Sequence, residues 1–226
     1  MKHSHEENAH RSTVPTLPLW LEPARVGLVG YAELLAGPGT ERGLIGPREI
    51  PRLWDRHILN CAVVADPATG LIPAGCVVAD VGSGAGLPGL VWALARPDIS
   101  VVLVEPLLRR ATFLTEAIIE LGLTARVQVV RARAEDLPGT PTWVGVDVVT
   151  ARAVAPMDKL VGWTLPLARR GGTLLALKGA SAQEEVDSAG AELAAAGVVE
   201  AEVVTLGAGV VDPLTTVVVA RTSPAQ

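Results

Sequence analysis

The spacing of apolar residues along the first third of the chain predicts two helices. One is expected over residues 17–35 and is expected to end at the Gly-Pro-Gly stretch 37–39. Its expected core positions are Leu21, Val26, Val29 and Leu34. The second is expected to begin at Pro47 or Pro51, because proline is tolerated in a first turn, and to run to about Val64. Its apolar positions include Leu53, Trp54, Ile58 and Cys61.

From residue 76 onward, short β-branched runs alternate with segments of helical spacing. Strands are expected at 76–81, 101–105, 127–131, 146–150 and 172–178, and helices at 87–95, 109–121, 157–167 and 183–196. Such alternation predicts parallel strands with helices on both faces. The last two expected strands, 198–205 and 215–220, have no helix between them and should pair as an antiparallel hairpin. The pattern therefore predicts an α/β, Rossmann-like fold with a seven-stranded sheet.

Length and composition fit one folded domain with a helical cap. The chain has 226 residues, of which 49% are apolar. We expect a disordered tail over residues 1–15, a helical cap over 16–70 and the α/β domain over 71–226. The tail contains His3, His5 and His10, which we interpret as part of a disordered segment rather than as a metal site.

Residue usage also bears on compartment and partners. The N-terminus is polar and no apolar run is long enough for a bilayer, which favours a cytosolic protein without a membrane partner. Cys61 and Cys76 are expected to be buried thiols. The net charge of −5 argues against RNA binding, but residues 179–220 hold seven acids and no Lys or Arg. Residues 1–178 carry 18 basic and 17 acidic side chains, so this part of the chain is able to present a basic face to RNA.

The glycine-rich segment 80–89, Asp-Val-Gly-Ser-Gly-Ala-Gly-Leu-Pro-Gly, lies between an expected strand and an expected helix. Glycines there allow a tight turn and a close approach of the backbone to a ligand. A dinucleotide-binding fingerprint requires glycine at position 87, but this chain has leucine there, so the segment does not match that fingerprint. The pattern of Asp80, Gly82, Gly84 and Gly86 instead resembles the first motif of S-adenosylmethionine enzymes, in which the loop wraps the methionine end of the cofactor. The expected sheet also matches that of the class I methyltransferases.

Acidic residues also follow the next two strands. Glu105 ends the second strand, 23 positions after Gly82, where a carboxylate is able to accept hydrogen bonds from both ribose hydroxyls. Ala134, Glu135 and Asp136 follow the third strand, at the loop that borders the adenine ring in this fold.

The fourth strand ends at Thr-Ala-Arg-Ala, residues 150–153, where the methyl acceptor should bind. Two motifs are absent from the sequence: the Asn/Asp-Pro-Pro-aromatic tetrapeptide of exocyclic-amine methylation and the Pro-Cys nucleophile of pyrimidine carbon-5 methylation. Guanine N7 fits the remaining chemistry, because it carries a free lone pair. Arg152 and Lys178 are candidates for orienting a guanine.

Three arginines, Arg48, Arg52 and Arg56, recur every four residues and share one face of the expected helix. They are interpreted either as a solvated face or as a ridge that contacts RNA phosphates.

These residues together resemble the RsmG (GidB) family of bacterial ribosomal RNA methyltransferases, from about residue 41 to 220. The resemblance rests on Arg-His-Ile-Leu at 56–59, the segment 80–89, Ala-Arg-Ala at 151–153 and Ala-Leu-Lys-Gly at 176–179. Residues 41–49 resemble the actinobacterial branch. Many relatives outside that branch have Asn-Leu-Thr where this chain has Gly43, Leu44 and Ile45, so any role of that Asn does not carry over.

The resemblance implies transfer of a methyl group from S-adenosylmethionine to N7 of one guanine in the decoding-region loop of 16S rRNA, within the small ribosomal subunit or an assembly intermediate. It implies S-adenosylhomocysteine as product and an association between loss of the methyl group and streptomycin resistance. It also implies that the cofactor contacts Gly82, Leu87, Ala134, Glu135 and Arg152. We expect RNA contacts at Arg48, Arg52, Arg56, His57 and Lys178.

The sequence leaves rival functions open. One is a methyltransferase acting on a small molecule or another RNA, and another is a non-catalytic protein that binds the cofactor. An NAD-dependent oxidoreductase is disfavoured by Leu87. We expect a monomer that needs no metal.

Overall fold

The computed structural model describes residues 14–224, and its described part contains a single seven-stranded sheet. The strands are β1 (Val77–Val81), β2 (Ser100–Val104), β3 (Val127–Val130), β4 (Val146–Arg152), β5 (Ala168–Lys178), β6 (Val198–Leu206) and β7 (Thr215–Thr222). Their order is β3-β2-β1-β4-β5-β7-β6. Strands β1 to β5 are parallel, and β7 is antiparallel to both β5 and β6. The expected five parallel strands and closing hairpin are confirmed.

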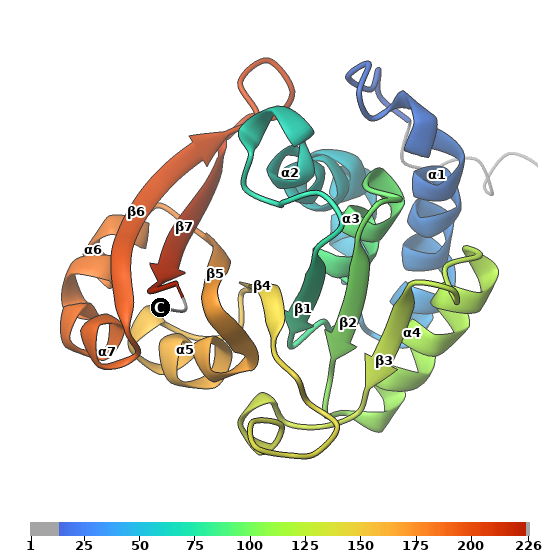
Figure 1. The fold of residues 1–226 in the computed structure, drawn as a ribbon. Helices are drawn as coiled ribbons and strands as arrows, with labels where there is room; N and C mark the ends of the chain where they lie inside the picture. The colour runs from blue at the N-terminus through green and yellow to red at the C-terminus, as the bar shows by residue number, and fades with distance from the viewer. Residues whose placement is uncertain (1–13, 225–226) are drawn as a thin grey trace, which may run out of the picture.

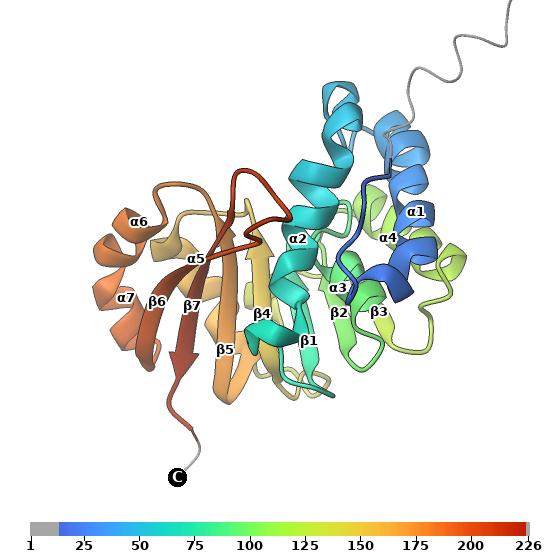
Figure 2. The ribbon, with the colours of Figure 1, turned by 90° about the horizontal axis from the view of Figure 1, so that it is seen from above.

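The two faces of the sheet bury alternate side chains, because successive strand residues point to opposite sides. In β7, Val217 and Val219 enter one apolar cluster and Val218 and Ala220 enter the other. Helices α3 (Gly89–Ala95) and α4 (Leu108–Glu120) cover the first face. Helices α5 (Met157–Thr164), α6 (Ala182–Ser188) and α7 (Gly190–Ala195) cover the second (Figures 1 and 2).

The N-terminal cap packs on the same face as α3 and α4 (Figure 2). Its helical segments are Glu22–Ala24, α1 (Arg25–Leu34), Leu35–Gly39, Pro47–Arg52, Leu53–Leu59, α2 (Asn60–Ala62), Val63–Ala65 and Pro67–Thr69. Trp92 of α3 donates its indole N–H to the carbonyl oxygen of Cys61 at 2.9 Å. The cap and the first face of the sheet thus share one apolar core.

Two expectations for the first helix are wrong. Val26 is 86% exposed rather than buried, whereas Leu28 and Tyr31 are fully buried. The helical spacing begins only at Arg25, after Pro23, so Leu21 belongs to a preceding turn and does not set the phase of the helix. The Gly-Pro-Gly stretch does not end the helix either, because Leu35–Gly39 continues as a wider π-helical turn that includes Pro38.

Other expectations hold more closely. The second cap helix runs from Pro47 to Ala65, and Cys61 and Cys76 are both buried. The helix expected at 183–196 is two helices that meet at Ala189. Between residues 14 and 224, no helix has the length and apolar character needed to cross a bilayer. The histidines of the expected tail lie outside the described residues.

Candidate active site

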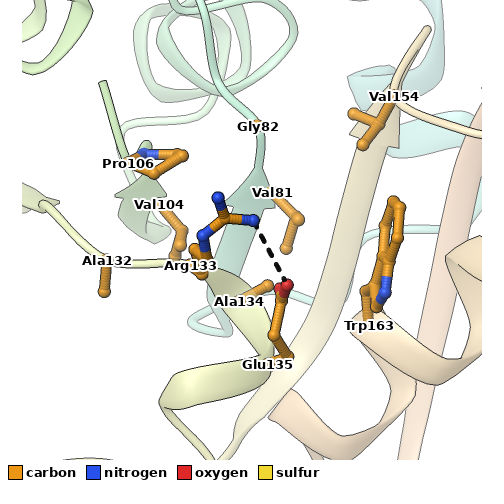
Figure 3. Close-up of a pocket in the computed structure, with 10 residues that line it drawn as sticks. All are labelled: Val81, Gly82, Val104, Pro106, Ala132, Arg133, Ala134, Glu135, Val154 and Trp163. Carbon is orange, nitrogen blue, oxygen red and sulfur yellow. Dashed lines mark ion pairs between the residues drawn. The ribbon is translucent and has the colours of Figure 1, made fainter.

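Loops that follow β1 to β5 meet at the carboxyl edge of the sheet and enclose three adjoining cavities. The first cavity, which we call the slot, is lined by Val81, Gly82, Val104, Pro106, Ala132, Arg133, Ala134, Glu135, Val154 and Trp163 (Figure 3). The second, the loop cavity, is lined by Leu44, Ile45, His57, Gly82, Ser83, Gly84, Ala85, Leu87, Arg110, Arg152, Ala153 and Val154. The third, the outer cavity, is lined by Glu49, Asp55, Arg56, His57, Asn60, Arg152, Lys178, Gly179, Ala180, Asp212, Pro213, Leu214 and Thr216. The slot and the loop cavity share Gly82 and Val154, and the loop and outer cavities share His57 and Arg152.

The glycine-rich loop is fastened at both ends by hydrogen bonds to its surroundings. The amides of Gly82 and Ser83 donate to the carbonyl oxygen of Val104, at 2.9 and 3.3 Å. The Tyr31 hydroxyl of the cap donates to the carbonyl oxygen of Ala85 at 2.7 Å. A fixed loop of this kind holds its backbone in place for a ligand without reorganising.

Asp80, the penultimate residue of β1, is fully buried next to this loop. One carboxylate oxygen, Oδ2, accepts from the amide of Gly89 at 3.0 Å, whereas Oδ1 finds no hydrogen-bond partner in the described part of the chain. Burial raises the pKa of Asp80 to about 7. A buried polar atom without a partner is costly, so Asp80 is suited to a ligand that donates a hydrogen bond or carries positive charge.

Glu105 holds the loops after β1 and β2 together. Its side chain is 1% exposed. Its oxygens accept from the amides of Leu107, at 2.9 Å, and Gly84, at 3.0 Å. Glu105 thus supports the glycine-rich loop in this structure, and its contact with ribose stays a prediction.

The slot is lined mainly by apolar side chains, and its role as an adenine site stays a prediction. Ala134 and Glu135, in the short helix Ala134–Asp136, form one wall, and Trp163 of α5 faces them from the other side (Figure 3). Glu135 forms an ion pair with Arg133 at 3.8 Å near this wall. Trp163, like Val154 and Pro106, was not among the expected site residues. Its place depends on how α5 packs across the sheet, for which the sequence contains no local signal.

Arg152 and Lys178, the candidates for orienting a guanine, both line the outer cavity, and each is already hydrogen-bonded. Lys178 Nζ donates to the carbonyl oxygen of Ala155 at 2.6 Å and to Glu185 Oε2 at 2.7 Å. It therefore holds the loop after β4, in which Ala153 has a left-handed φ of 54°. Arg152 donates to cap residues, including the sulfur of Cys61 at 3.1 Å.

The three cap arginines are all exposed, yet they do not form the single ridge that their spacing predicts. Arg48 and Arg52 belong to a 3-10 segment, in which residues four apart lie about a third of a turn from each other. Arg56 lies in the following π-helical segment, and its Nη1 is 3.8 Å from Glu49 Oε2. His57, expected to contact RNA, has a side chain that is only 14% exposed and faces Arg152.

No group of three or more His, Cys, Asp or Glu side chains within residues 14–224 is arranged to hold a metal ion. Leu44 and Ile45, part of the segment that departs from the common family pattern, line the loop cavity.

Comparison with known proteins identifies the family. Residues 26–213 match the model of the family described as rRNA small subunit methyltransferase G. The chain belongs to this family. It is 60% identical over 194 residues to the ribosomal RNA small subunit methyltransferase G of Salinispora tropica, covering 84% of this chain and 78% of the relative. It is 56% identical over 190 residues to that of Streptomyces avermitilis, covering 84% and 77%.

Solved structures show the same fold at low sequence identity. An O-methyltransferase family protein from Burkholderia thailandensis has a TM-score of 0.56 at 15% identity, covering 88% of this chain and 63% of its own. A SAM-dependent O-methyltransferase from Thermotoga maritima has a TM-score of 0.54 at 16% identity, covering 79% and 71%. These likenesses establish the class I methyltransferase fold for the sheet and its helices.

Proposed function

We propose that the protein transfers a methyl group from S-adenosyl-L-methionine to N7 of a guanine in the decoding-region loop of 16S rRNA. The family supports a methyltransferase acting on small-subunit rRNA. The observation that carries the proposal is the unbroken series of cavities at the carboxyl edge of the sheet, which joins an apolar slot to an outer cavity that Arg152 and Lys178 line.

The residues present fit S-adenosylmethionine. The apolar slot between Ala134 and Trp163 would take the adenine ring, and Glu105, which accepts from the amide of Gly84 in the loop, would be the ribose ligand. Gly82, Leu87 and Arg152 would border the methionine end. The unpartnered oxygen of Asp80 lies next to the same loop and suits a cationic ligand. When bound, this cofactor supplies a methyl group that its sulfonium has already activated.

The outer cavity fits a guanine presented by RNA. Arg152 uses three of its five N–H donors in the contacts with the cap, and Lys178 uses two of its three with Ala155 and Glu185. The remaining donors suit guanine O6. Donors directed at O6 would leave the N7 lone pair free to attack, so the chain's contribution is to orient the base and exclude water.

Several finer expectations follow from the same proposal. The product is S-adenosylhomocysteine, and the protein works in the cytoplasm as a metal-free monomer on a small subunit or its assembly intermediate. Loss of the methyl group is expected to confer streptomycin resistance. Arg48, Arg52 and Arg56 would contribute phosphate contacts separately rather than as one ridge.

Methyl transfer from labelled cofactor to small ribosomal subunits that lack the modification tests the proposal. The labelled base is then mapped by cleavage chemistry specific for 7-methylguanine. Naked 16S rRNA and assembly intermediates, assayed in parallel, identify the preferred form. Label at an exocyclic amine or a ring carbon would contradict N7 chemistry. Absence of label in every RNA would favour a small-molecule substrate or a protein that only binds the cofactor.

A further inference from the structure

The cap, rather than a carboxylate, supplies the partners of the Arg152 guanidinium. Arg152 Nη2 donates to His57 Nδ1 at 2.7 Å and to the carbonyl oxygen of Arg56 at 3.3 Å. Arg152 Nη1 donates to Cys61 Sγ at 3.1 Å. The His57 contact is the shortest of the three, so this imidazole is the partner best placed to fix the guanidinium.

These contacts define the protonation state of His57. A guanidinium only donates hydrogen bonds, so His57 Nδ1 must accept from Arg152. On the other side of the ring, Nε2 lies 3.0 Å from Glu49 Oε2, and a carboxylate only accepts. The hydrogen bond from His57 also lowers the pKa of Glu49, which keeps it ionised. His57 is therefore a neutral imidazole with its proton on Nε2.

A second proton on His57 is incompatible with this arrangement. It would place an Nδ1–H against an N–H of Arg152 across 2.7 Å, so that two donors and two positive charges would face each other. Burial, followed by the charge of Arg152, lowers the pKa of His57 from its ordinary value, so the neutral form persists at neutral pH.

The other charged groups around His57 come from several elements. Glu49 in the segment Pro47–Arg52 favours the protonated form, whereas Arg56 in His57's own segment and Arg152 at the end of β4 oppose it. The outer cavity is also lined by Asp55 of His57's own segment, Lys178 of β5 and Asp212 of the loop between β6 and β7.

Arg152 occupies the border between the two halves of the site. It lines the loop cavity beside the glycine-rich loop and also the outer cavity beside Lys178. Its neighbour Ala153 has a left-handed φ of 54°, so the backbone at this point is strained and its geometry is set by surrounding contacts. A movement of the guanidinium would therefore alter both halves of the site.

We propose that His57, oriented by Glu49, is a positioning residue that holds Arg152 for methyl transfer only while its Nδ1 is unprotonated. The inference rests on the proposed methyltransferase function. The cap thus contributes to catalysis through one imidazole, and the enzyme loses activity at acid pH when that imidazole takes up a proton.

Matched variants separate this role from general packing. In His57→Asn the amide oxygen takes the place of Nδ1 and still accepts from Arg152, but it does not titrate. In His57→Gln the amide lies near the position of Nε2, out of line with Arg152. Glu49→Gln keeps an acceptor for Nε2–H but removes the charge that favours protonation. Thermal unfolding of each variant confirms that it folds.

The assay is kcat and KM for methyl transfer to small subunits from pH 5.5 to 8.5. At pH 8, His57→Gln should lose about tenfold or more in kcat, the scale of a lost hydrogen bond to a charged group, while His57→Asn stays within about threefold of the parent. The acid limb of the parent profile should be absent in His57→Asn. In Glu49→Gln the acid limb should move to lower pH by roughly half a unit, because one partly exposed ion pair that favours protonated His57 is lost. Equal losses in both His57 variants, or an acid limb that persists in His57→Asn, would overturn the proposal.

A measurement without turnover distinguishes this inference from the proposed function. The protein has four histidines, of which only His57 lies among the described residues, so its ring signal is assigned by its loss in His57→Asn. Long-range proton–nitrogen NMR should show a neutral ring with its proton on Nε2 down to a pH below about 6.5, the ordinary histidine value. A ring protonated at pH 7, or one with its proton on Nδ1, would refute the positioning role whether or not the RNA is methylated.

Discussion

Replacement of Gly84 by alanine tests whether the glycine-rich loop binds the cofactor. A Cβ built on Gly84 meets only the carbonyl oxygen of Gly82, 3.7 Å away, so the protein itself has room for the methyl group. The backbone has a φ of +59°, which costs an alanine about 1–2 kcal/mol in folding free energy. If the methionine end of the cofactor lies against this loop, the methyl group also overpacks the complex.

Gly70 offers a matched control away from the site. Its φ is +66° and a Cβ there has nothing within 4 Å, so Gly70→Ala carries the same backbone cost without approaching the cavities. For a chain of this size both variants should lose about 2–4 °C in Tm for each kcal/mol. Overpacking costs about 1–3 kcal/mol, so only Gly84→Ala should weaken cofactor binding, by about five- to a hundredfold.

Calorimetric titration with S-adenosylhomocysteine measures the affinity, and thermal unfolding without ligand measures the backbone cost. If the cofactor lies against this loop, the two variants should lose similar amounts of Tm and only Gly84→Ala should lose affinity. Parental affinity in a Gly84→Ala variant destabilised like Gly70→Ala would show that the ligand does not approach this loop.

Three further predictions follow from the site. Glu105→Ala should weaken S-adenosylmethionine binding by about 1.5–3 kcal/mol in calorimetry, and NADH should not bind either form. The pKa of Asp80 is raised by burial to about 7 from 3.8, so the ligand-free protein should lose stability as pH rises from 3.8 to about 7, with no further loss above that. The Tm of the parent, relative to that of Asp80→Asn, should therefore rise as pH falls below about 7, and equal pH dependence of the two proteins would refute the assignment. Replacing Arg48, Arg52 and Arg56 together by Gln should reduce the slope of log affinity for single-stranded RNA against log salt by at most about 0.7 per lost contact, with cofactor binding unchanged. An unchanged slope would show that these three arginines form a solvated surface without RNA contacts.

The sheet was predictable because its strands carry a strong local signal. Runs such as Ser100–Val104 are β-branched and bounded by turns, and each lies within a few residues of its expected place. The Gly-rich loop after β1 and the acid after β2 were predictable for the same reason, since both follow directly from where a strand ends.

The cap was predicted less well because its helices are irregular. Val26 was placed in the core because a single regular helix was expected from residue 17, whereas the 3-10 turn Glu22–Ala24 precedes α1. Expecting 3.6 residues per turn placed Arg48, Arg52 and Arg56 on one face. The chain instead uses 3-10 and π-helical turns at Pro47–Arg52 and Leu53–Leu59, which change the angle between residues of fixed spacing. These turns also aim His57 at Arg152, 95 positions away. A contact of that range depends on tertiary packing and has no signature in either local sequence.

The apolar core shared by the cap and the first sheet face has a consequence for synthesis on the ribosome. Buried cap residues such as Leu21, Leu28 and Ile58 leave the ribosome before α3, α4 and the strands they cover. Until that part of the chain emerges, the cap has nothing against which to bury them. Nascent chains that stop before α3 should therefore recruit chaperones and be cleaved readily by protease. Since Tyr31 and His57 reach the site from the cap, the site is completed only when this early segment docks.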